Sequence, residues 1–355
     1  MEKERRKSRI NPLLITANIT SILSLICCIA ILFLVVSNNK SQEAEQEVMM
    51  NLEPDRTYTA DEVDALVAEA KLEGGEEGKE EIREDIKDAY MNGTGIVHEL
   101  RLLFPNDIVF YNNGRYQFEP ISSNIPARTY DPTGLVVNTR GEMEYQVNGG
   151  VKSLKGIDLS RYQGDIDWSK VAGDGVDYAM IRVGIRGYGT GEIVIDDTLD
   201  ANMMGATYNG IDVGAYFFTQ AISEEEAIEE AEAVIEALAP YNVTYPIAID
   251  VEDVNDSSAR TANLTATQRT DYVIAFCERL EEAGYTPMIY GNLKTYCDML
   301  EMERLNDYEK WFAFYDTYVY FPYEISMWQY TDSGTVNGIE GNVDLNITFT
   351  DKYHK

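Results

Sequence analysis

From residue 151 onward, short apolar segments typical of strands alternate with amphipathic segments typical of helices. Two helices have clear boundaries: 223–238 opens with a Ser-x-x-Glu capping box before Pro240, and 265–283 opens with Thr-x-x-Gln before Gly284. The predicted strands are 156–158, 178–183, 212–217, 245–251, 286–290, 311–315, 325–328 and 342–345. Eight strands with intervening helices predict an α/β fold, a (β/α) barrel of TIM type over residues 151–355. Because the last three strands follow one another closely, the barrel should be irregular, with fewer helices, at its C-terminal end.

The start of the chain has a different pattern. Five basic residues lie within the first nine positions, and residues 12–37 are uncharged and rich in Leu and Ile. An apolar run of this length can cross a bilayer as a helix, and the basic residues before it favour a cytoplasmic N-terminus. We therefore expect a cytoplasmic tail at 1–11, an uncleaved transmembrane signal anchor at 12–37 in the plasma membrane, and the rest of the chain outside the cell. A cleaved signal peptide, the alternative, would have a shorter apolar core followed by a small-x-small site.

Two segments of different composition separate the predicted anchor from the predicted barrel. Residues 38–95 are rich in Glu, Asp, Lys and Ala, with apolar residues at helical spacing, and predict an acidic, partly helical stalk. Residues 96–150 are richer in aromatic and branched side chains around Asn113-Gly114, which is a β-hairpin signal. This second segment is expected to form a small β-containing module or an arm packed on the barrel, and no chemistry is assigned to it.

Charge and residue types exclude several classes of function. The chain carries 61 acidic against 29 basic residues, a net charge of −32, which disfavours nucleic acid as a partner. The only two histidines, His98 and His354, form no metal-ligand set, and no phosphate-binding glycine loop or Ser-His-Asp arrangement is visible, so no metal or cofactor is expected. Cys277 and Cys297 could pair in an oxidising compartment, but two free buried thiols is the preferred interpretation.

The candidate chemistry lies at the end of the fourth predicted strand, where Asp250 and Glu252 are separated by one residue. In a strand such residues project from the same side, and mutual repulsion in a buried setting raises at least one pKa. This arrangement suits an acid and a base made from similar side chains, although a strand that simply meets solvent can also end in acids. Asp158 and Asp344 stand on the first and last predicted strands. Because barrel strands present their C-terminal ends at one mouth, we expect all four acids to converge there.

Seven segments carry a resemblance to a known family. They are 156–164, 166–168, 178–184, 212–217, 250–252, 327–330 and 343–346. In this order they resemble glycoside hydrolase family 25, the Chalaropsis-type lysozymes or N-acetylmuramidases. The resemblance covers about residues 154–349 and leaves the first 150 residues unassigned.

The resemblance implies hydrolysis of the β-1,4 bond between N-acetylmuramic acid and N-acetylglucosamine in peptidoglycan glycan strands. By the same resemblance Glu252 would be the general acid, and Asp250 would stabilise the developing positive charge or orient the substrate's 2-acetamido group as nucleophile. Asp158 would complete the catalytic set. Aromatic residues at strand ends suit the flat faces of sugars, and about half of the four aromatic candidates are expected to touch substrate. The residues assigned to substrate binding are Asp344, Tyr216, Tyr290, Trp328, Gln329 and Tyr330.

Three functions are compatible with these features. The first is a membrane-anchored muramidase that trims the cell's own wall. The second is a non-catalytic surface protein that binds the wall or acts as a scaffold, with the barrel as a carbohydrate-binding module. A missing acid would favour it, and all four are present. The third, a phage or secreted lysin, is disfavoured by the predicted anchor.

Overall fold

The computed structural model describes residues 78–89, 91–92, 96–112, 114–349 and 353. The predicted tail at 1–11, the predicted transmembrane anchor at 12–37 and most of the predicted stalk lie outside these residues. Within the part that is described, no helix is both long enough and apolar enough to cross a membrane. Two compact units divide the chain, Met1–Leu100 and Arg101–Lys355. In the first unit, residues 78–89 and 91–92 are helical.

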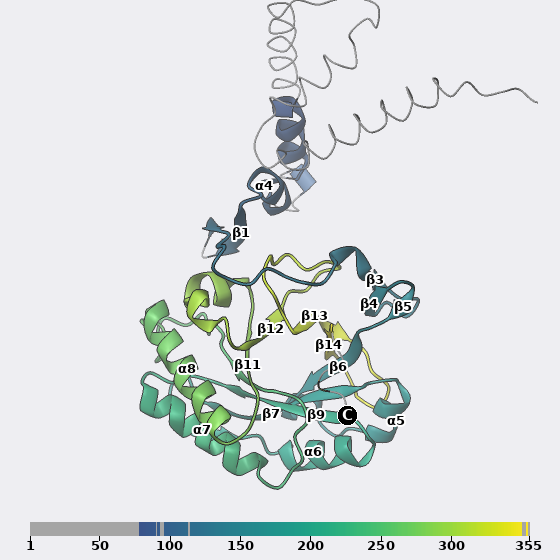
Figure 1. Cartoon of the computed structure of the whole chain (residues 1–355), viewed down its shortest axis with the longest axis vertical. Coiled ribbons are helices and arrows are strands. Elements are labelled where there is room, and N and C mark those ends of the chain that lie inside the picture. The colour runs from purple at the N-terminus through teal and green to yellow at the C-terminus, as the bar shows by residue number, and fades with distance from the viewer. Residues whose placement is uncertain (1–77, 90, 93–95, 113, 350–352, 354–355) are drawn as a thin grey trace, which may run out of the picture. The chain divides into compact units, whose positions relative to one another are not determined.

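The second unit contains a closed barrel of eight strands (Figure 1). In spatial order the strands are β6 (Leu154–Leu159), β14 (Val343–Thr348), β13 (Met327–Gly334), β12 (Glu309–Ala313), β11 (Pro287–Gly291), β10 (Ile247–Asp250), β9 (Asp212–Phe218) and β7 (Tyr178–Arg186). Pairing of β6 with β7 closes the ring, and the short β8 (Ile193–Ile195) adds to the outer edge of β7. The prediction of eight barrel strands is confirmed.

The direction of the last strand differs from the prediction. Neighbours from β6 around through β7 to β13 are parallel, but β14 runs antiparallel to both β13 and β6. The expectation that Asp344 lies at the C-terminal end of a parallel strand is therefore wrong. Asp344 is near the start of β14, and the reversed direction brings that start to the mouth where the parallel strands end. There it pairs in register with Asp158 of β6.

Helices cover the first half of the barrel and become short in the second half (Figure 1). The full α-helices are α5 (Trp168–Gly173), α6 (Leu199–Tyr208), α7 (Glu224–Leu238) and α8 (Ala266–Glu282). Both predicted capping boxes are helix starts: the Ser223 hydroxyl accepts the Glu226 N–H, and Thr265 and Gln268 cap reciprocally. Between β11 and β14 there are only a π-helical turn, Thr295–Met299, and a 3₁₀ turn, Met302–Leu305. The predicted irregular C-terminal end is thus observed.

An arm of the chain precedes the barrel and packs on it. After α4 (Val97–Leu103), the hairpin β1 (Asp107–Asn112) and β2 (Arg115–Pro120) turns at the Asn-Gly pair. A second small sheet follows, formed by β3 (Leu135–Val137), β4 (Met143–Val147) and β5 (Gly150–Val151).

Specific contacts tie this arm to the barrel. The Val109 and Ser122 N–H groups donate to the hydroxyls of Tyr320 and Tyr323, each at 2.8 Å. The Tyr130 ring stacks on Phe349, just past β14, with centroids 4.2 Å apart. Residues 101–355 consequently form a single compact unit.

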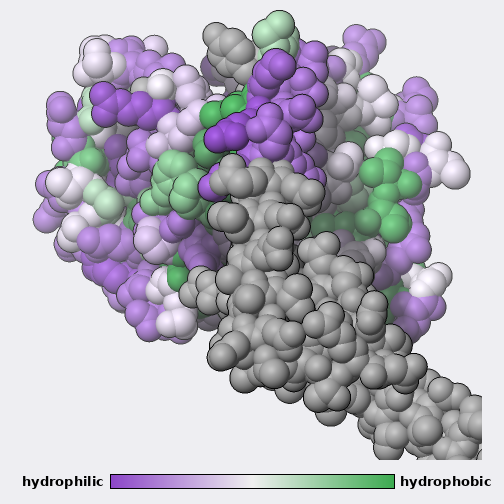
Figure 2. All heavy atoms as spheres, turned by 90° about the horizontal axis from the view of Figure 1, so that it is seen from above, coloured by the Kyte–Doolittle hydropathy of each residue, from purple (hydrophilic) through white to green (hydrophobic). Residues whose placement is uncertain are grey.

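Side chains fill the barrel below the mouth. The Tyr178 and Tyr245 rings stack with centroids 4.4 Å apart, and Trp311 is fully buried above them. A Cβ on Gly156 would come within 2.0 Å of the Tyr178 ring, so only glycine fits there. On the outside, hydrophilic residues predominate on the face shown in Figure 2, and apolar residues form small separate patches.

Candidate active site

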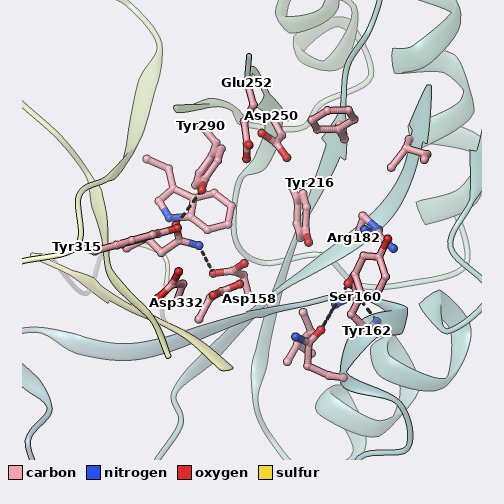
Figure 3. Close-up of a pocket in the computed structure, with 17 residues that line it drawn as sticks. Asp158, Ser160, Tyr162, Arg182, Tyr216, Asp250, Glu252, Tyr290, Tyr315 and Asp332 are labelled. Atoms are coloured by element: carbon pink, nitrogen blue, oxygen red, sulfur yellow. Dashed lines mark hydrogen bonds between the residues drawn. The ribbon is translucent and has the colours of Figure 1, made fainter. Parts of the chain in front are cut away.

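A cavity of about 470 Å³ opens at the mouth of the barrel (Figure 3). Its lining combines five carboxylates with one arginine and several aromatic rings. The lining residues are Asp158, Leu159, Ser160, Tyr162, Gln163, Arg182, Ile185, Tyr216, Phe218, Asp250, Glu252, Tyr290, Trp311, Tyr315, Gln329, Asp332 and Asp344. Its volume is in the range of pockets that hold a small ligand, about 300–1,000 Å³.

The first acid pair stands at the end of β10. Asp250 is the last residue of the strand and is 5% exposed, while Glu252 follows two residues later and is half-buried. The two carboxyl groups are hydrogen-bonded to each other, and Asp250 Oδ1 has no further partner. Burial raises the pKa of both groups, and the charge of Glu252 raises that of Asp250 further. One proton shared by the pair is the arrangement that this environment favours.

The second acid pair lies across the barrel seam. Asp158 on β6 and Asp344 on β14 are also in hydrogen-bond contact. Burial raises the pKa of each, and the charge of Asp344 raises that of Asp158 further. Asp158 Oδ2 accepts from Gln329 Nε2 at 2.8 Å and from Asn346 Nδ2 at 2.7 Å. These two donors favour the ionised form of Asp158 and partly offset the effect of burial.

A layer of aromatic donors orients the amides that hold Asp158. Trp311 Nε1 donates to Asn346 Oδ1 at 2.7 Å. The hydroxyls of Tyr290 and Tyr315 both donate to Gln329 Oε1, at 2.8 and 3.0 Å. Because the amide oxygens are engaged in this way, the NH₂ groups of both amides face Asp158.

The cavity lining has a single cation. Arg182 of β7 donates from Nε and Nη2 to Asp196 Oδ2, at 2.8 and 2.7 Å, which fixes its guanidinium in place. Its charge lowers the pKa of Asp250, in opposition to burial and to Glu252. The guanidinium carbon lies 5.1 Å from the ring of Tyr162, an exposed rim residue. Five carboxylates against one arginine leave the site able to stabilise positive charge that develops on a bound ligand.

Seven of the nine predicted site residues line this cavity: Asp158, Asp250, Glu252, Asp344, Tyr216, Tyr290 and Gln329. Trp328 and Tyr330 do not line it, and the placement of Trp328 in the groove is corrected. They flank Gln329 on β13, and since side chains alternate along a strand, they point to the opposite face. Trp328 is fully buried there and donates from Nε1 to the Phe314 carbonyl at 2.8 Å. Tyr330 lines a neighbouring cavity.

Several lining residues were missed from the sequence. Arg182 had a usable signal, because it is the only basic residue in the otherwise apolar predicted strand 178–183. Trp311 and Tyr315 lay in a predicted strand, but the sequence did not show whether their side chains point into the barrel or away from it. Asp332 gave no such signal, since register shifts after Gln329 disturb the alternation that would have placed it.

Two further observations concern possible metal ligands and the cysteines. Among the residues that the structure describes, no group of three or more His, Cys, Asp or Glu side chains is arranged to hold a metal ion. Cys277 and Cys297 are both free, the first buried and the second half-buried. Burial raises the pKa of both thiols, which disfavours their reactive thiolate forms.

Comparison with known proteins identifies a family and several relatives. The model of the glycosyl hydrolases family 25 matches residues 157–339, about half of the chain. The uncharacterised protein YegX of Escherichia coli K12 is 29% identical over 205 residues, which cover 55% of this chain and 69% of YegX. Lysozyme M1 of Streptomyces globisporus is 29% identical over 206 residues, 54% of this chain and 67% of that enzyme.

Among solved structures, the modular autolysin LytC of Streptococcus pneumoniae, in complex with a synthetic peptidoglycan ligand, is similar with a TM-score of 0.50 and 28% identity. The similarity covers 60% of this chain and 52% of LytC. The chain therefore spans about half the length of that autolysin.

Proposed function

The chain belongs to family 25 of the glycosyl hydrolases, and from that premise we propose that it is a muramidase. Its reaction would be hydrolysis of the β-1,4 bond between N-acetylmuramic acid and N-acetylglucosamine in peptidoglycan. The observation that carries the proposal is the hydrogen-bonded pair Asp250 and Glu252 at the mouth of the barrel. The similarity to a lysozyme and to an autolysin solved with a peptidoglycan ligand supports the choice of substrate.

Glu252 is the better placed of the two acids to protonate the leaving oxygen. It is half-buried, whereas Asp250 is 5% exposed at the bottom of the pair. Before substrate binds, the deeper burial of Asp250 favours the location of the shared proton on Asp250. A substrate 2-acetamido N–H that donates to the unpartnered Asp250 Oδ1 would favour ionised Asp250 and shift the proton to Glu252. Substrate binding would thus protonate Glu252, the general acid.

The contact between the two carboxyls also bears on the nucleophile. Retaining glycosidases with an enzyme nucleophile hold their carboxyls about 5–5.5 Å apart, and inverting enzymes hold them roughly 6.5–9.5 Å apart. A pair in direct hydrogen-bond contact leaves no space for a sugar carbon or an attacking water between its members. This geometry favours the 2-acetamido group of the substrate as nucleophile, with Asp250 as the group that orients it.

The second acid pair would act through its charge. Asp158 and Asp344 face the first pair across the cavity, and Asp158 contributes to the raised pKa of Asp250 while Asp344 contributes to that of Glu252. Negative charge at this position stabilises an oxocarbenium-like transition state and keeps a proton on the first pair near neutral pH.

We further propose a location for this activity. The basic residues before the uncharged span 12–37 support a signal anchor in the plasma membrane, with the N-terminus in the cytoplasm and the barrel outside. The acid-rich residues 38–95 would separate the anchor from the barrel. A membrane-held muramidase of this kind would act on the wall of the cell that makes it.

Digestion of purified peptidoglycan by the full-length protein tests the proposal. Mass spectrometry of the soluble fragments should show new reducing ends of N-acetylmuramic acid. Reducing N-acetylglucosamine ends would show that a different bond is cleaved. Binding to the wall without any fragment release would favour the non-catalytic wall-binding alternative.

A further inference from the structure

A second cavity, of about 570 Å³, adjoins the first. One side is formed by β3–β4 of the arm, and the other by residues that follow β12 and by the outer part of β13. Tyr315 and Asp332 line both cavities. Tyr315 is 52% exposed and its hydroxyl is fixed by Gln329, so its ring stands as a rigid divider between the two spaces.

The arm side of this second cavity lies outside the family match. Val137, Arg140, Gly141, Glu142 and Met143 line it, and the match begins at residue 157. The arm side of the cavity is therefore an addition made by this chain's own N-terminal arm. The opposite side, formed by residues 315–317 and 330–335, lies within the family match.

The arm is held in position by a charged network. Arg140 and Lys155 both bind Glu142 and Asp174, with four N–O distances between 2.7 and 3.1 Å. The Glu142, Lys155 and Asp174 side chains are each at most 15% exposed, so these contacts are largely shielded from solvent. The Tyr145 ring of β4 also packs edge-on against Phe349, at 5.5 Å. The arm side of the cavity is therefore held rigidly before a ligand binds, which lowers the entropic cost of binding.

The lining chemistry suits a neutral polyhydroxylated ligand. Four serine and threonine side chains line the cavity: Thr317, Thr331, Ser333 and Thr335. The carboxylates of Glu142, Asp316 and Asp332 disfavour a peptide stem as the ligand of this cavity, so a bound glycan strand would hold its sugars in the cavity and its stems outside it. Arg140, the only cation of the lining, is already engaged by Glu142 and Asp174. Sugar rings bind well to exposed tyrosine faces such as that of Tyr315.

We propose that this second cavity is an extension of the substrate groove that binds saccharide units of the glycan strand beyond those held in the barrel mouth. This inference rests on the proposed function, because it takes the same polymer as ligand. A strand lying in the first cavity would cross Tyr315 and continue between the arm and β13. The arm would thereby make the enzyme prefer long glycan strands to short fragments.

The test measures binding separately from cleavage. Full-length protein carrying Glu252→Gln is titrated with stem-bearing glycan fragments of two and of four disaccharides. We expect the longer fragment to bind at least about tenfold more tightly, a factor that corresponds to ~1.4 kcal/mol. Adding Val137→Trp, which fills the arm side of the cavity, should bring this ratio close to one and leave the affinity for the short fragment unchanged.

A matched control is Val147→Trp on the same small sheet. Val147 is 40% exposed, against 50% for Val137, and it does not line the cavity. It should keep the wild-type ratio. Equal affinity for both lengths in the protein with its native arm would overturn the extension alone, whereas no binding of either length would overturn the proposed substrate as well. Free stem peptide that binds the native arm but not Val137→Trp would show a peptide site and also overturn the proposal.

Discussion

Asp158 and Asp344 lie directly opposite each other on β6 and β14, and their carboxyl groups are in hydrogen-bond contact. Like charges opposite one another destabilise an antiparallel pair. The barrel therefore closes at a seam that costs stability at neutral pH, and that seam forms one wall of the cavity that holds Asp250 and Glu252. Such a cost is common where a site needs a concentrated charge.

The Asp344→Asn substitution should stabilise the protein in a pH-dependent way. The pKa values of Asp158 and Asp344 are raised in the folded state, so the folded state binds more protons than the unfolded state above the ordinary carboxyl pKa of about 4. The contribution of these two groups to the free energy of unfolding is therefore largest below about pH 4, and it is lost as the pH rises through their raised pKa values. We expect the variant's Tm to match that of the wild type near pH 4 and to exceed it by roughly 2–4 °C at pH 7. A lower Tm at pH 7 would contradict this account.

The same substitution should shift the pH dependence of activity. Asp344 raises the pKa of Glu252 through its negative charge, so its removal lowers that pKa. The acid form of the pair is then lost at a lower pH, and the basic limb of kcat/KM should move to lower pH. Asp307→Asn, an exposed acid before β12 at the far end of the barrel, is the control and should leave the limb in place. If the basic limb of kcat/KM stays in place in Asp344→Asn, then the charge of Asp344 does not influence the pKa of the general acid.

Glu252→Gln should abolish turnover without unfolding the barrel. Glutamine can keep a hydrogen bond to Asp250 but cannot deliver a proton, so kcat should fall by about 10²–10⁴. Release of reducing ends measures the loss, and circular dichroism checks the fold. Asp253→Asn is the matched control, because this neighbouring carboxylate pairs with Lys294 and does not line the cavity. Full activity in Glu252→Gln would show that the general acid is a different residue.

Local signals in the sequence predicted much of the fold and the acid pairs. Capping residues located α7 and α8, and the Asp-x-Glu spacing placed two acids together at the end of β10. Features that depend on pairing between strands were not predictable in this way. The antiparallel direction of β14 is set by its neighbours, and the facing of Trp328 follows from which side of β13 meets the interior. The position of Asp332 depends on register shifts between β13 and β14, and no residue pattern in the sequence predicts these shifts.

Tyr290→Phe and Tyr315→Phe should show coupling. Both hydroxyls donate to the same oxygen of Gln329, so either single variant leaves that oxygen with one donor. The double variant leaves the Gln329 oxygen without a tyrosine donor and frees the amide that holds Asp158. We expect urea unfolding to show a double-variant loss that exceeds the sum of the single losses by about 0.5–1.5 kcal/mol. Strict additivity would show that the two tyrosines act independently.

The proposed anchor gives a prediction that does not depend on catalysis. A span inserted in the bilayer is held by apolar burial and not by surface charge, so the full-length protein should stay with membranes after high-salt and alkaline washing. A variant that lacks residues 1–37 should be recovered in the soluble fraction under the same washes. Protease added outside protoplasts should remove the barrel, because the basic residues before the span keep the N-terminus inside. A mature N-terminus near Asn38, with the protein free in the medium, would instead show a cleaved signal peptide.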